Sequence, residues 1–264
     1  MSINGQASGL VRIAASGDIH ADPPARERIC NEFRALRDVD LLLLAGDLTT
    51  TGDPEQAQVV ADACAELPFP SIAVLGNHDW HSGRWNEITA VLTEAGVRVL
   101  QQEATTLEIR GISVGVVGTK GFVGGFRGFQ LTDFGEPLLR QLYAETTAEV
   151  AAIDRGLYAI AGCDVQIVLL HYAPTMQTLE GEPSSIWAFL GSDRMGVPIA
   201  EHRPDLVLHG HGHAGRFEGA IGDVPVYNVA VPVTGRTFTR FHLSPGHSRP
   251  LVNEESATAG GDGA

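Results

Sequence analysis

The amino-acid sequence predicts an α/β fold in which a parallel or mixed sheet carries helices on both faces. Apolar runs of strand length alternate with amphipathic helical segments through the first half of the chain. The run Leu41-Leu42-Leu43-Leu44 is apolar on both faces, as a central parallel strand requires. With 264 residues, of which 44% are apolar, the chain is long enough for one large domain with a full core.

The first half of the chain supplies the alternating elements. We expect strands at 10–16, 40–45 and 71–75. Helices are expected between and after them, at 23–37, 54–66 and 84–95. Pro23 and Pro24 open the first of these helices, and Gly96 ends the third. Right-handed crossovers then place these helices against the sheet.

The second half contains shorter strands and one long helix. Strands are expected at 97–100, 105–109, 112–117, 164–170 and 205–208. Helices are expected at 137–161 and around 184–190. The last three strands, near 216–220, 224–230 and 238–243, are expected to be antiparallel and to close the sheet.

The strands and helices predict one domain from residue 10 to residue 243. Residues 1–9 are polar and are expected to be flexible; they lack the basic and apolar regions of a signal peptide. Residues 244–264 are rich in glycine, serine and glutamate, and we expect a disordered tail there.

The composition limits the cellular compartment and the classes of binding partner that we expect. No run of 18 apolar residues is present, so no membrane span is expected. Cys30, Cys64 and Cys163 are odd in number and lie in apolar or helical patterns, which favours free thiols in the cytoplasm over disulfides. A net charge of −14 argues against a nucleic-acid partner, because phosphate backbones bind basic patches. An anionic small-molecule substrate is still compatible, since bound cations can dominate the local field.

Polar residues follow the first three expected strands. Asp18 and His20 come after the first strand, and their spacing of two directs both side chains the same way on an extended segment. Asp47 follows the second strand, and Gly76-Asn77-His78-Asp79 follows the third. Ligands of α/β sheets collect outside the carboxyl ends of the strands, where all of these residues are expected.

Histidines follow two later strands. His171 ends the strand 164–170, and His209-Gly210-His211-Gly212-His213 ends the strand 205–208. A lone histidine is usually structural, but three alternating with glycines at a strand end favour metal ligands. Gly210 and Gly212 allow a tight turn, so that His211 and His213 can face neighbouring ions.

These side chains predict a dinuclear metal site. Mixed carboxylate, amide and imidazole donors suit Mn, Fe or Zn, and seven side chains are too many for one ion. The candidate ligands are Asp18, His20, Asp47, Asn77, His171, His211 and His213. Two metal ions can clamp the attacking and leaving oxygens of a phosphoryl displacement. A purely structural zinc site is disfavoured, because such sites are usually rich in cysteine and no cysteine lies near these positions.

The motifs resemble the complete signature of the calcineurin-like metallophosphoesterase superfamily. The five blocks occur in the family's order within residues 17–213: Asp18-x-His20, Gly46-Asp47, Gly76-Asn77-His78-Asp79, His171 and Gly210-His211-x-His213. The resemblance implies a four-layer α/β/β/α sandwich of two mixed sheets flanked by helices. It also implies a dinuclear site at the strand ends.

The resemblance further implies a role for each residue. One metal would be held by Asp18, His20 and His213. The other would be held by Asn77, His171 and His211, and Asp47 would bridge the two. His78 would contact the phosphate and stabilise the transition state or protonate the leaving oxygen. Asp79 would orient His78.

The second and third blocks narrow the branch of the family. Protein phosphatases and related dinucleoside-polyphosphate hydrolases carry Asp-Arg-Gly after the second block and Glu in the third. This sequence has Leu48-Thr49-Thr50 and Asp79 there, which is closer to the cyclic-nucleotide and general phosphodiesterase branch. The expected activity is hydrolysis of a phosphodiester by in-line attack of a metal-bridging hydroxide. The alternatives are a phosphomonoesterase acting on a nucleotide or sugar phosphate and, from another class, a non-catalytic scaffold.

Two segments leave alternatives open. Residues 119–129 carry four glycines and three phenylalanines without a regular period. They form either an irregular loop whose phenylalanines pack on the core, or a mobile lid in which Phe126 stacks on the substrate and Arg127 binds a phosphate oxygen. Segment 174–197 either covers the site or makes a dimer contact, so a homodimer stays open.

Overall fold

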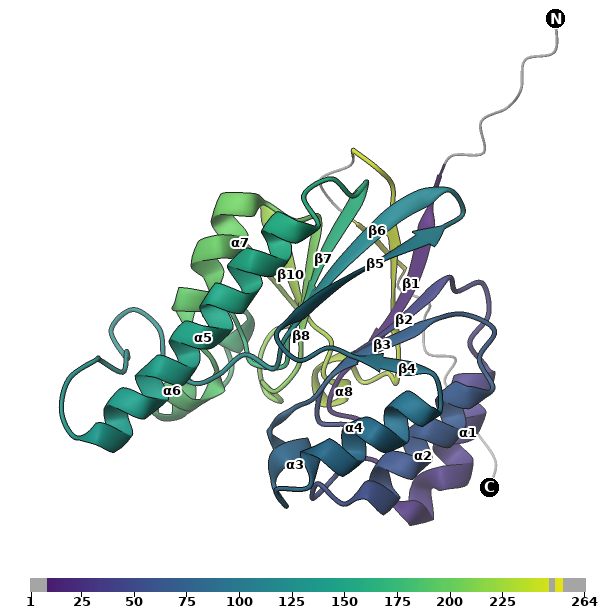
Figure 1. The fold of residues 1–264 in the computed structure, drawn as a ribbon, viewed down its shortest axis with the longest axis horizontal. Helices are drawn as coiled ribbons and strands as arrows, with labels where there is room; N and C mark the ends of the chain where they lie inside the picture. Colours follow the sequence, from purple (N-terminus) through teal and green to yellow (C-terminus); the bar gives the residue numbers. More distant parts are fainter. Residues whose placement is uncertain (1–8, 247–249, 254–264) are drawn as a thin grey trace, which may run out of the picture.

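The computed structural model describes residues 9–246 and 250–253. Its strands form two six-stranded sheets, shown in Figure 1. In spatial order, the first sheet contains β12 (Leu251–Asn253), β11 (Thr239–Leu243), β1 (Val11–Ser16), β2 (Leu41–Ala45), β3 (Ser71–Val74) and β4 (Val97–Val99). The second contains β5 (Glu103–Ile109), β6 (Ile112–Gly118), β7 (Val165–Leu169), β8 (Leu206–His209), β10 (Val224–Asn228) and β9 (Glu218–Ile221).

Helices cover the outer face of each sheet. Those packed on the first sheet are α1 (Arg26–Arg34), α2 (Pro54–Ala65) and α4 (Trp85–Glu94). Those packed on the second are α5 (Pro137–Ala159) and α7 (Gly196–His202). The remaining helices are single turns: α3 (Asn77–Trp80), α6 (Trp187–Leu190) and α8 (Val231–Thr234). The predicted four-layer α/β/β/α sandwich is therefore confirmed.

The alternation of side chains along each strand builds the layers. In β2, Leu41 and Leu43 lie in the apolar core between the two sheets, whereas Leu42 and Leu44 pack against the helices. All four side chains are fully buried. Burying a leucine contributes roughly 1.5–3 kcal/mol, so this strand anchors both layers. The parallel pairing of β1 with β2 and of β2 with β3 brings their carboxyl ends to one edge.

Several helix boundaries differ from the expectation. The helix expected over 23–37 is a 3₁₀ turn, Pro23–Ala25, followed by α1, which ends at Arg34. α7 was not predicted, because Gly196 and Pro198 oppose a helix in isolation and tertiary packing overrides that local preference. Further short turns occur at Gln177–Leu179, Ser184–Ile186 and Asp193–Met195.

The closing strands are not all antiparallel. β11 pairs antiparallel with β1, and β9 pairs antiparallel with β10, as expected. β10, however, runs parallel to β8. The chain passes from β8 to the sheet edge at β9, and the tight turn at Gly222 and Asp223 then reverses it into the space beside β8.

The expected disordered tail is wrong for residues 251–253. They form β12, which pairs antiparallel with β11 in the register Arg240↔Asn253. β11 would otherwise present an unpaired edge, and Val252 packs against the inter-sheet core. Three residues among glycine, serine and glutamate were too few to reveal a strand. The rest of the expected tail from 254, and residues 1–8 of the expected flexible N-terminus, lie outside the described residues.

All three cysteines lie in the described part of the chain. Cys30, Cys64 and Cys163 are free thiols; the first two are buried and the third is half-buried. Burial raises the pKa of the Cys64 thiol to about 12.

Within the described ranges, no helix has the length and apolar character needed to cross a bilayer.

Candidate metal centre

The candidate ligands lie where strands end in strained turns. Asp18, His20 and Asp47 have φ angles of 57°, 47° and 49°, and His211 has 71°. Residues other than glycine rarely adopt this left-handed conformation, and it clusters at functional sites. Asp18 and His20 therefore reach the same space through two left-handed residues, and the extended segment expected for them is absent.

Glycines allow the carboxylates and a ring to approach the main chain. A Cβ added to Gly76 would overlap the carboxylate of Asp47, and one added to Gly210 would overlap that of Asp18. At Gly46, which has φ 81°, an added Cβ would lie 2.7 Å from Nδ1 of His171. The glycines of the motifs thus form a cradle that side chains of the centre fill.

The first donor group contains Asp18, His20 and His213. Their candidate ligand atoms all lie within 4.8 Å of one another. Oδ1 of Asp18 lies 2.8 Å from Nε2 of His213, and its Oδ2 accepts a hydrogen bond from the backbone N–H of His211 at 2.9 Å. Nδ1 of His20 is buried and has no hydrogen-bond partner in the described part of the chain. A metal ion would satisfy this buried nitrogen.

The second donor group contains Asp47, His171 and His211, again within 4.8 Å of one another. Asn77 lies beside them, with its Oδ1 2.9 Å from Nε2 of His171. Nδ1 of His171 donates to the carbonyl of Ala45 at 2.9 Å, which leaves the lone pair of Nε2 facing the centre, 3.3 Å from Oδ1 of Asp47. A main-chain carbonyl that fixes the tautomer is typical of metal-binding histidines.

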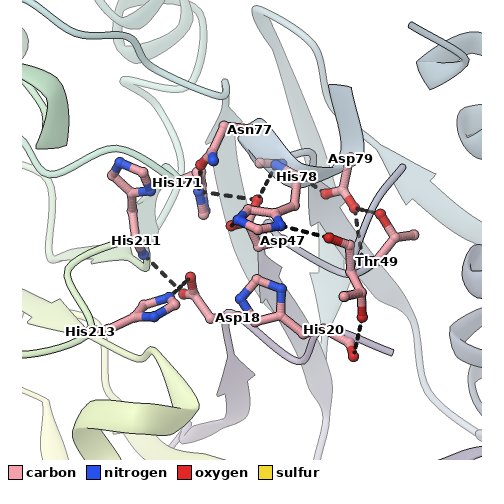
Figure 2. A network of polar contacts seen from close by, with 12 residues as sticks. Asp18, His20, Asp47, Thr49, Asn77, His78, Asp79, His171, His211 and His213 are labelled. Carbon is pink, nitrogen blue, oxygen red and sulfur yellow. Dashed lines mark hydrogen bonds and ion pairs between the residues drawn. The ribbon is translucent and has the colours of Figure 1, made fainter. Parts of the chain in front are cut away.

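Asp47 lies between the two groups, as Figure 2 shows. It belongs to the second donor group and also to a third, formed with His20 and His78. Because His20 also belongs to the first group, the side chains form one continuous set of donors. The second and third groups share Asp47, and the first and third share His20. Donor groups that adjoin across a central carboxylate are compatible with a pair of metal ions.

The electrostatics of the ligands suit cations. Burial lowers the pKa of His211 to about 3, with a further contribution from His171, so its imidazole is neutral and can bind a metal at neutral pH. Burial also lowers the pKa of His20. Burial of Asp18 acts to raise its pKa, but the hydrogen bond to His213, the charges of His171 and His213 and the N–H of His211 together outweigh this and keep the pKa of the carboxyl below its ordinary value. The residues therefore fit metal ions.

His78 is held at the edge of this centre. Its backbone N–H donates to Oδ1 of Asp47 at 2.8 Å. Its Nδ1 donates to the carbonyl of Thr50 at 2.7 Å, so Nε2 is the free nitrogen, 3.9 Å from Oδ2 of Asp47. The side chain is 37% exposed, which makes Nε2 accessible to a substrate.

Asp79 has a different task from the one expected. Its carboxylate is fully buried and accepts hydrogen bonds from the backbone N–H groups of Leu48, Thr49 and Gly76 at 2.8–3.2 Å. It also accepts one from the hydroxyl of Thr49 at 2.7 Å. It does not bond to the ring of His78, so the expectation that Asp79 orients His78 is corrected: the carbonyl of Thr50 does so. Asp79 instead ties the loop after β2 to the turn after β3.

The sequence offered little sign of these supporting groups. The carbonyls of Ala45 and Thr50 act through the main chain, which no side-chain pattern reveals. Thr49 stands next to the Gly46-Asp47 block, and its hydroxyl could have been considered as a partner for a buried carboxylate.

The glycine-rich segment 119–129 is hydrogen-bonded to the main chain of residues 188–193. The N–H groups of Gly124 and Gly125 donate to the carbonyls of Ala188 and Gly191 at 3.1 and 2.8 Å. Phe126 is 1% exposed and packs in a small apolar cluster, so the expectation that it stacks on a substrate is wrong. These contacts favour the irregular-loop alternative. Arg127 is exposed beside a groove, and its role in binding phosphate stays a prediction.

Comparison with known proteins identifies the family. The model of the calcineurin-like phosphoesterases matches residues 11–215. The chain belongs to this family. A probable cyclic nucleotide phosphodiesterase of Synechococcus sp. is 49% identical to this chain over 78 residues. The match covers 25% of this chain and 31% of the relative, so less than a third of that relative's length is matched.

Solved structures share the calcineurin-like fold at low sequence identity. The phosphopantetheinyl hydrolase PptH of Mycobacterium tuberculosis has a TM-score of 0.62 at 14% identity, over 95% of this chain and 99% of that one. Protein TT1561 of Thermus thermophilus has a TM-score of 0.57 at 18% identity, over 93% and 99%. These likenesses support the fold alone. Calcineurin-like phosphoesterases depend on metal ions, for which the donor groups above provide candidate ligands.

Proposed function

We propose that the protein hydrolyses phosphate esters with two metal ions that share Asp47, and that phosphodiesters are its preferred substrates. The observation that carries the proposal is the linked set of donor groups, in which Asp47 belongs to two groups and His20 connects the third, beside the accessible Nε2 of His78. A single structural ion would need neither the seven candidate ligands nor a free imidazole beside them.

The ligands divide into two sets. Asp18, His20 and His213 would hold one ion. Asn77, His171 and His211 would hold the other. When bound, the ions supply an activated water and neutralise the charge of the phosphate. The nitrogen and oxygen donors favour Mn, Fe or Zn.

His78 supplies the protein's own acid or hydrogen-bond donor. Because Nδ1 is engaged by the carbonyl of Thr50, a proton carried by the ring toward the substrate must lie on Nε2. From there it can bond a phosphate oxygen or protonate the leaving oxygen. The bond from its backbone N–H to Asp47 fixes the ring relative to the bridging carboxylate.

Two observations support a diester substrate. The sequence after Asp47 lacks the Asp-Arg-Gly of protein phosphatases, and the Synechococcus relative, matched over 78 residues, is named a probable cyclic nucleotide phosphodiesterase. The net charge of −14 also disfavours long nucleic acids, so we propose a small-molecule phosphate ester. A cytoplasmic location and a homodimer stay predictions.

Activity of metal-reconstituted protein tests the proposal. Metal-free protein is loaded with Mn²⁺ and assayed on bis-p-nitrophenyl phosphate and on p-nitrophenyl phosphate. We expect metal-dependent cleavage, with a higher kcat/KM on the diester. Asp47→Ala and Asn77→Ala should lose metal and activity together, whereas Asp133→Ala, which removes an exposed carboxylate elsewhere, should not.

The outcomes separate the alternatives. A higher kcat/KM on the monoester would replace the diesterase by a phosphomonoesterase. Full metal content and full hydrolysis in Asp47→Ala and Asn77→Ala would contradict the proposed centre. Two bound metals without cleavage of either ester would favour the scaffold.

A further inference from the structure

A second pocket adjoins the metal centre. Its volume is about 160 Å³, which is below the roughly 300–1,000 Å³ of sites for drug-sized ligands and suits one small ring system. It lies between the ends of β3 and β6 and the helix α5. The lining residues that matter here are Trp80, Gln101, Gln102, Lys120, Glu145 and Glu149.

Lys120 is the only lysine in the sequence, and aromatic rings surround it. Its Nζ lies 4.3 Å from the ring centroid of Phe122, 5.2 Å from that of Tyr172 and 5.6 Å from that of Trp80. Within the described residues its ammonium makes one hydrogen bond, to the carbonyl of Gly121 at 3.2 Å. An ammonium group has three donors, so two remain for a ligand in the pocket.

Lys120 connects the pocket to the metal centre. The carbonyl of Lys120 accepts hydrogen bonds from the N–H groups of His171 and Tyr172 at 3.1 and 3.0 Å. The ring of Tyr172 lies 4.5 Å from that of His211 and 5.5 Å from that of His171, measured between centroids. The ring of Tyr172 therefore contacts the ammonium group of Lys120 and also two proposed metal ligands. A phosphate at the centre would place its organic group near this pocket.

The charges in the pocket disfavour an anionic ligand. Glu149 is buried and accepts hydrogen bonds from the backbone N–H of Gly121 at 3.0 Å and the amide of Gln102 at 3.1 Å. Glu145 adds a second carboxylate near Lys120. One ammonium faces two carboxylates, so a further phosphate would be repelled.

The polar groups suit a neutral ring with donors and acceptors on its edge. Lys120 donates, Glu145 accepts, and the amide of Gln101 can do both. Trp80 is stacked on Trp85 with centroids 4.4 Å apart and an interplanar angle of 16°, which fixes the indole as a flat wall. Aromatic walls bind planar heterocycles by stacking.

We propose that this pocket, referred to as the Lys120 pocket, is a subsite for the organic group of the substrate and binds a neutral planar heteroaromatic ring such as a nucleobase. Lys120 donates to a carbonyl or ring nitrogen on its edge, and Trp80 packs against its face. The assignment rests on the proposed function, because it takes the phosphate to lie at the metal centre.

Three p-nitrophenyl diesters, compared in two pairs, test whether the subsite contributes to kcat/KM. Methyl p-nitrophenyl phosphate is compared with the p-nitrophenyl esters of thymidine 5′-phosphate and deoxyadenosine 5′-phosphate, which share its leaving group and differ in the other alcohol. In the Mn²⁺-loaded enzyme we expect kcat/KM to be roughly tenfold or more higher for at least one nucleoside ester, the effect of one hydrogen bond to a charged group. In Lys120→Met this ratio should fall toward one.

The control is Arg194→Met. Arg194 also lies over an aromatic ring, that of Tyr143 at 4.0 Å, but does not line the Lys120 pocket. This variant should keep the wild-type ratio. A wild-type ratio near one for both nucleosides, or a ratio unchanged in Lys120→Met, overturns the subsite. Failure of the wild type to cleave even the methyl ester counts against the proposed function instead.

A binding measurement does not depend on hydrolysis. Because the sequence has a single lysine, protein labelled with ¹³C at the lysine ε-carbon gives one side-chain NMR signal, that of Lys120. Thymidine or deoxyadenosine added to metal-free protein should shift this signal to saturation, whereas deoxyribose should not. An unmoved signal with both nucleosides overturns the subsite even if the esterase activity is present.

Discussion

At the scale of single residues, His78 has one free nitrogen and a fixed orientation. Its replacement should remove acid or hydrogen-bond assistance and leave the metal ligands in place. We expect His78→Ala to lower kcat on bis-p-nitrophenyl phosphate by about 10²–10⁴-fold. Metal content, measured on the same preparation, should stay at the wild-type level. Equal losses of metal and activity would make His78 a ligand.

Asp79 stabilises the loops that carry the ligands. Asp79→Ala would leave the buried N–H groups of Leu48, Thr49 and Gly76 without their acceptor. Each unsatisfied donor costs about 1–3 kcal/mol, so the free energy of unfolding should fall by at least about 2 kcal/mol. Denaturant unfolding of the metal-free protein measures this. A change below about 0.5 kcal/mol would mean that water replaces the carboxylate.

Residue types and spacing predicted which side chains gather at the centre, and the structure brings Asp18, Asp47 and His171 into contact with their partners. They could not predict what holds the side chains there. The task of Asp79 and the tautomer of His78 depend on carbonyl and N–H groups that every residue has. For Phe126 the sequence left packing on the core and stacking on a substrate both open, since apolar side chains serve both cores and binding sites.

At the scale of elements, the turn between β3 and α3 depends on Gly76. A Cβ at this position would overlap the main chain and carboxylate of Asp47, and backbone atoms cannot move aside cheaply. Gly76→Ala should therefore weaken metal binding and lower stability by more than about 2 kcal/mol. Gly162→Ala is the matched control, because a Cβ there meets open space. It should change stability by less than about 0.5 kcal/mol. Similar effects of the two substitutions would refute the role of Gly76.

An ion pair joins β1 to the start of β2. Arg12 donates to both carboxylate oxygens of Asp40 at 2.8–2.9 Å, and this hydrogen bonding lowers the pKa of Asp40. A lowered carboxyl pKa stabilises the fold above the unfolded value of about 3.9, and this is lost as pH falls through the folded pKa. Asp40→Asn should lower the melting temperature at pH 7. The difference from wild type should shrink as pH falls below about 4. A difference independent of pH would assign the effect to packing.

The predictability of the elements followed their length and periodicity. β2 is a continuous apolar run, β7 is apolar except for Gln166, and both were placed within a residue. β12 is too short to reveal a strand, and the Gly196 and Pro198 of α7 oppose a helix. Both exist because a neighbouring sheet edge or apolar face needs cover.

At the scale of the whole molecule, two sheets bring strand ends from distant parts of the sequence to one edge. Asp18 and His213 are 195 residues apart in the sequence, and Oδ1 of Asp18 lies 2.8 Å from Nε2 of His213. The order of the motifs predicted this architecture through the family resemblance, and the match over residues 11–215 agrees. The pairing of β10 with β8 was not predictable, because parallel and antiparallel neighbours have similar local patterns.

The central claim is that Asp47 joins two donor groups into one dinuclear centre, and counting bound metal tests it most directly. Metal-free protein is titrated with Mn²⁺ by calorimetry, with Asp47→Ala alongside and Asp133→Ala as control. We predict two Mn²⁺ per chain for the wild type and the control, and the loss of at least one of them in Asp47→Ala. A single Mn²⁺ per wild-type chain, or two still bound in Asp47→Ala, would contradict the account.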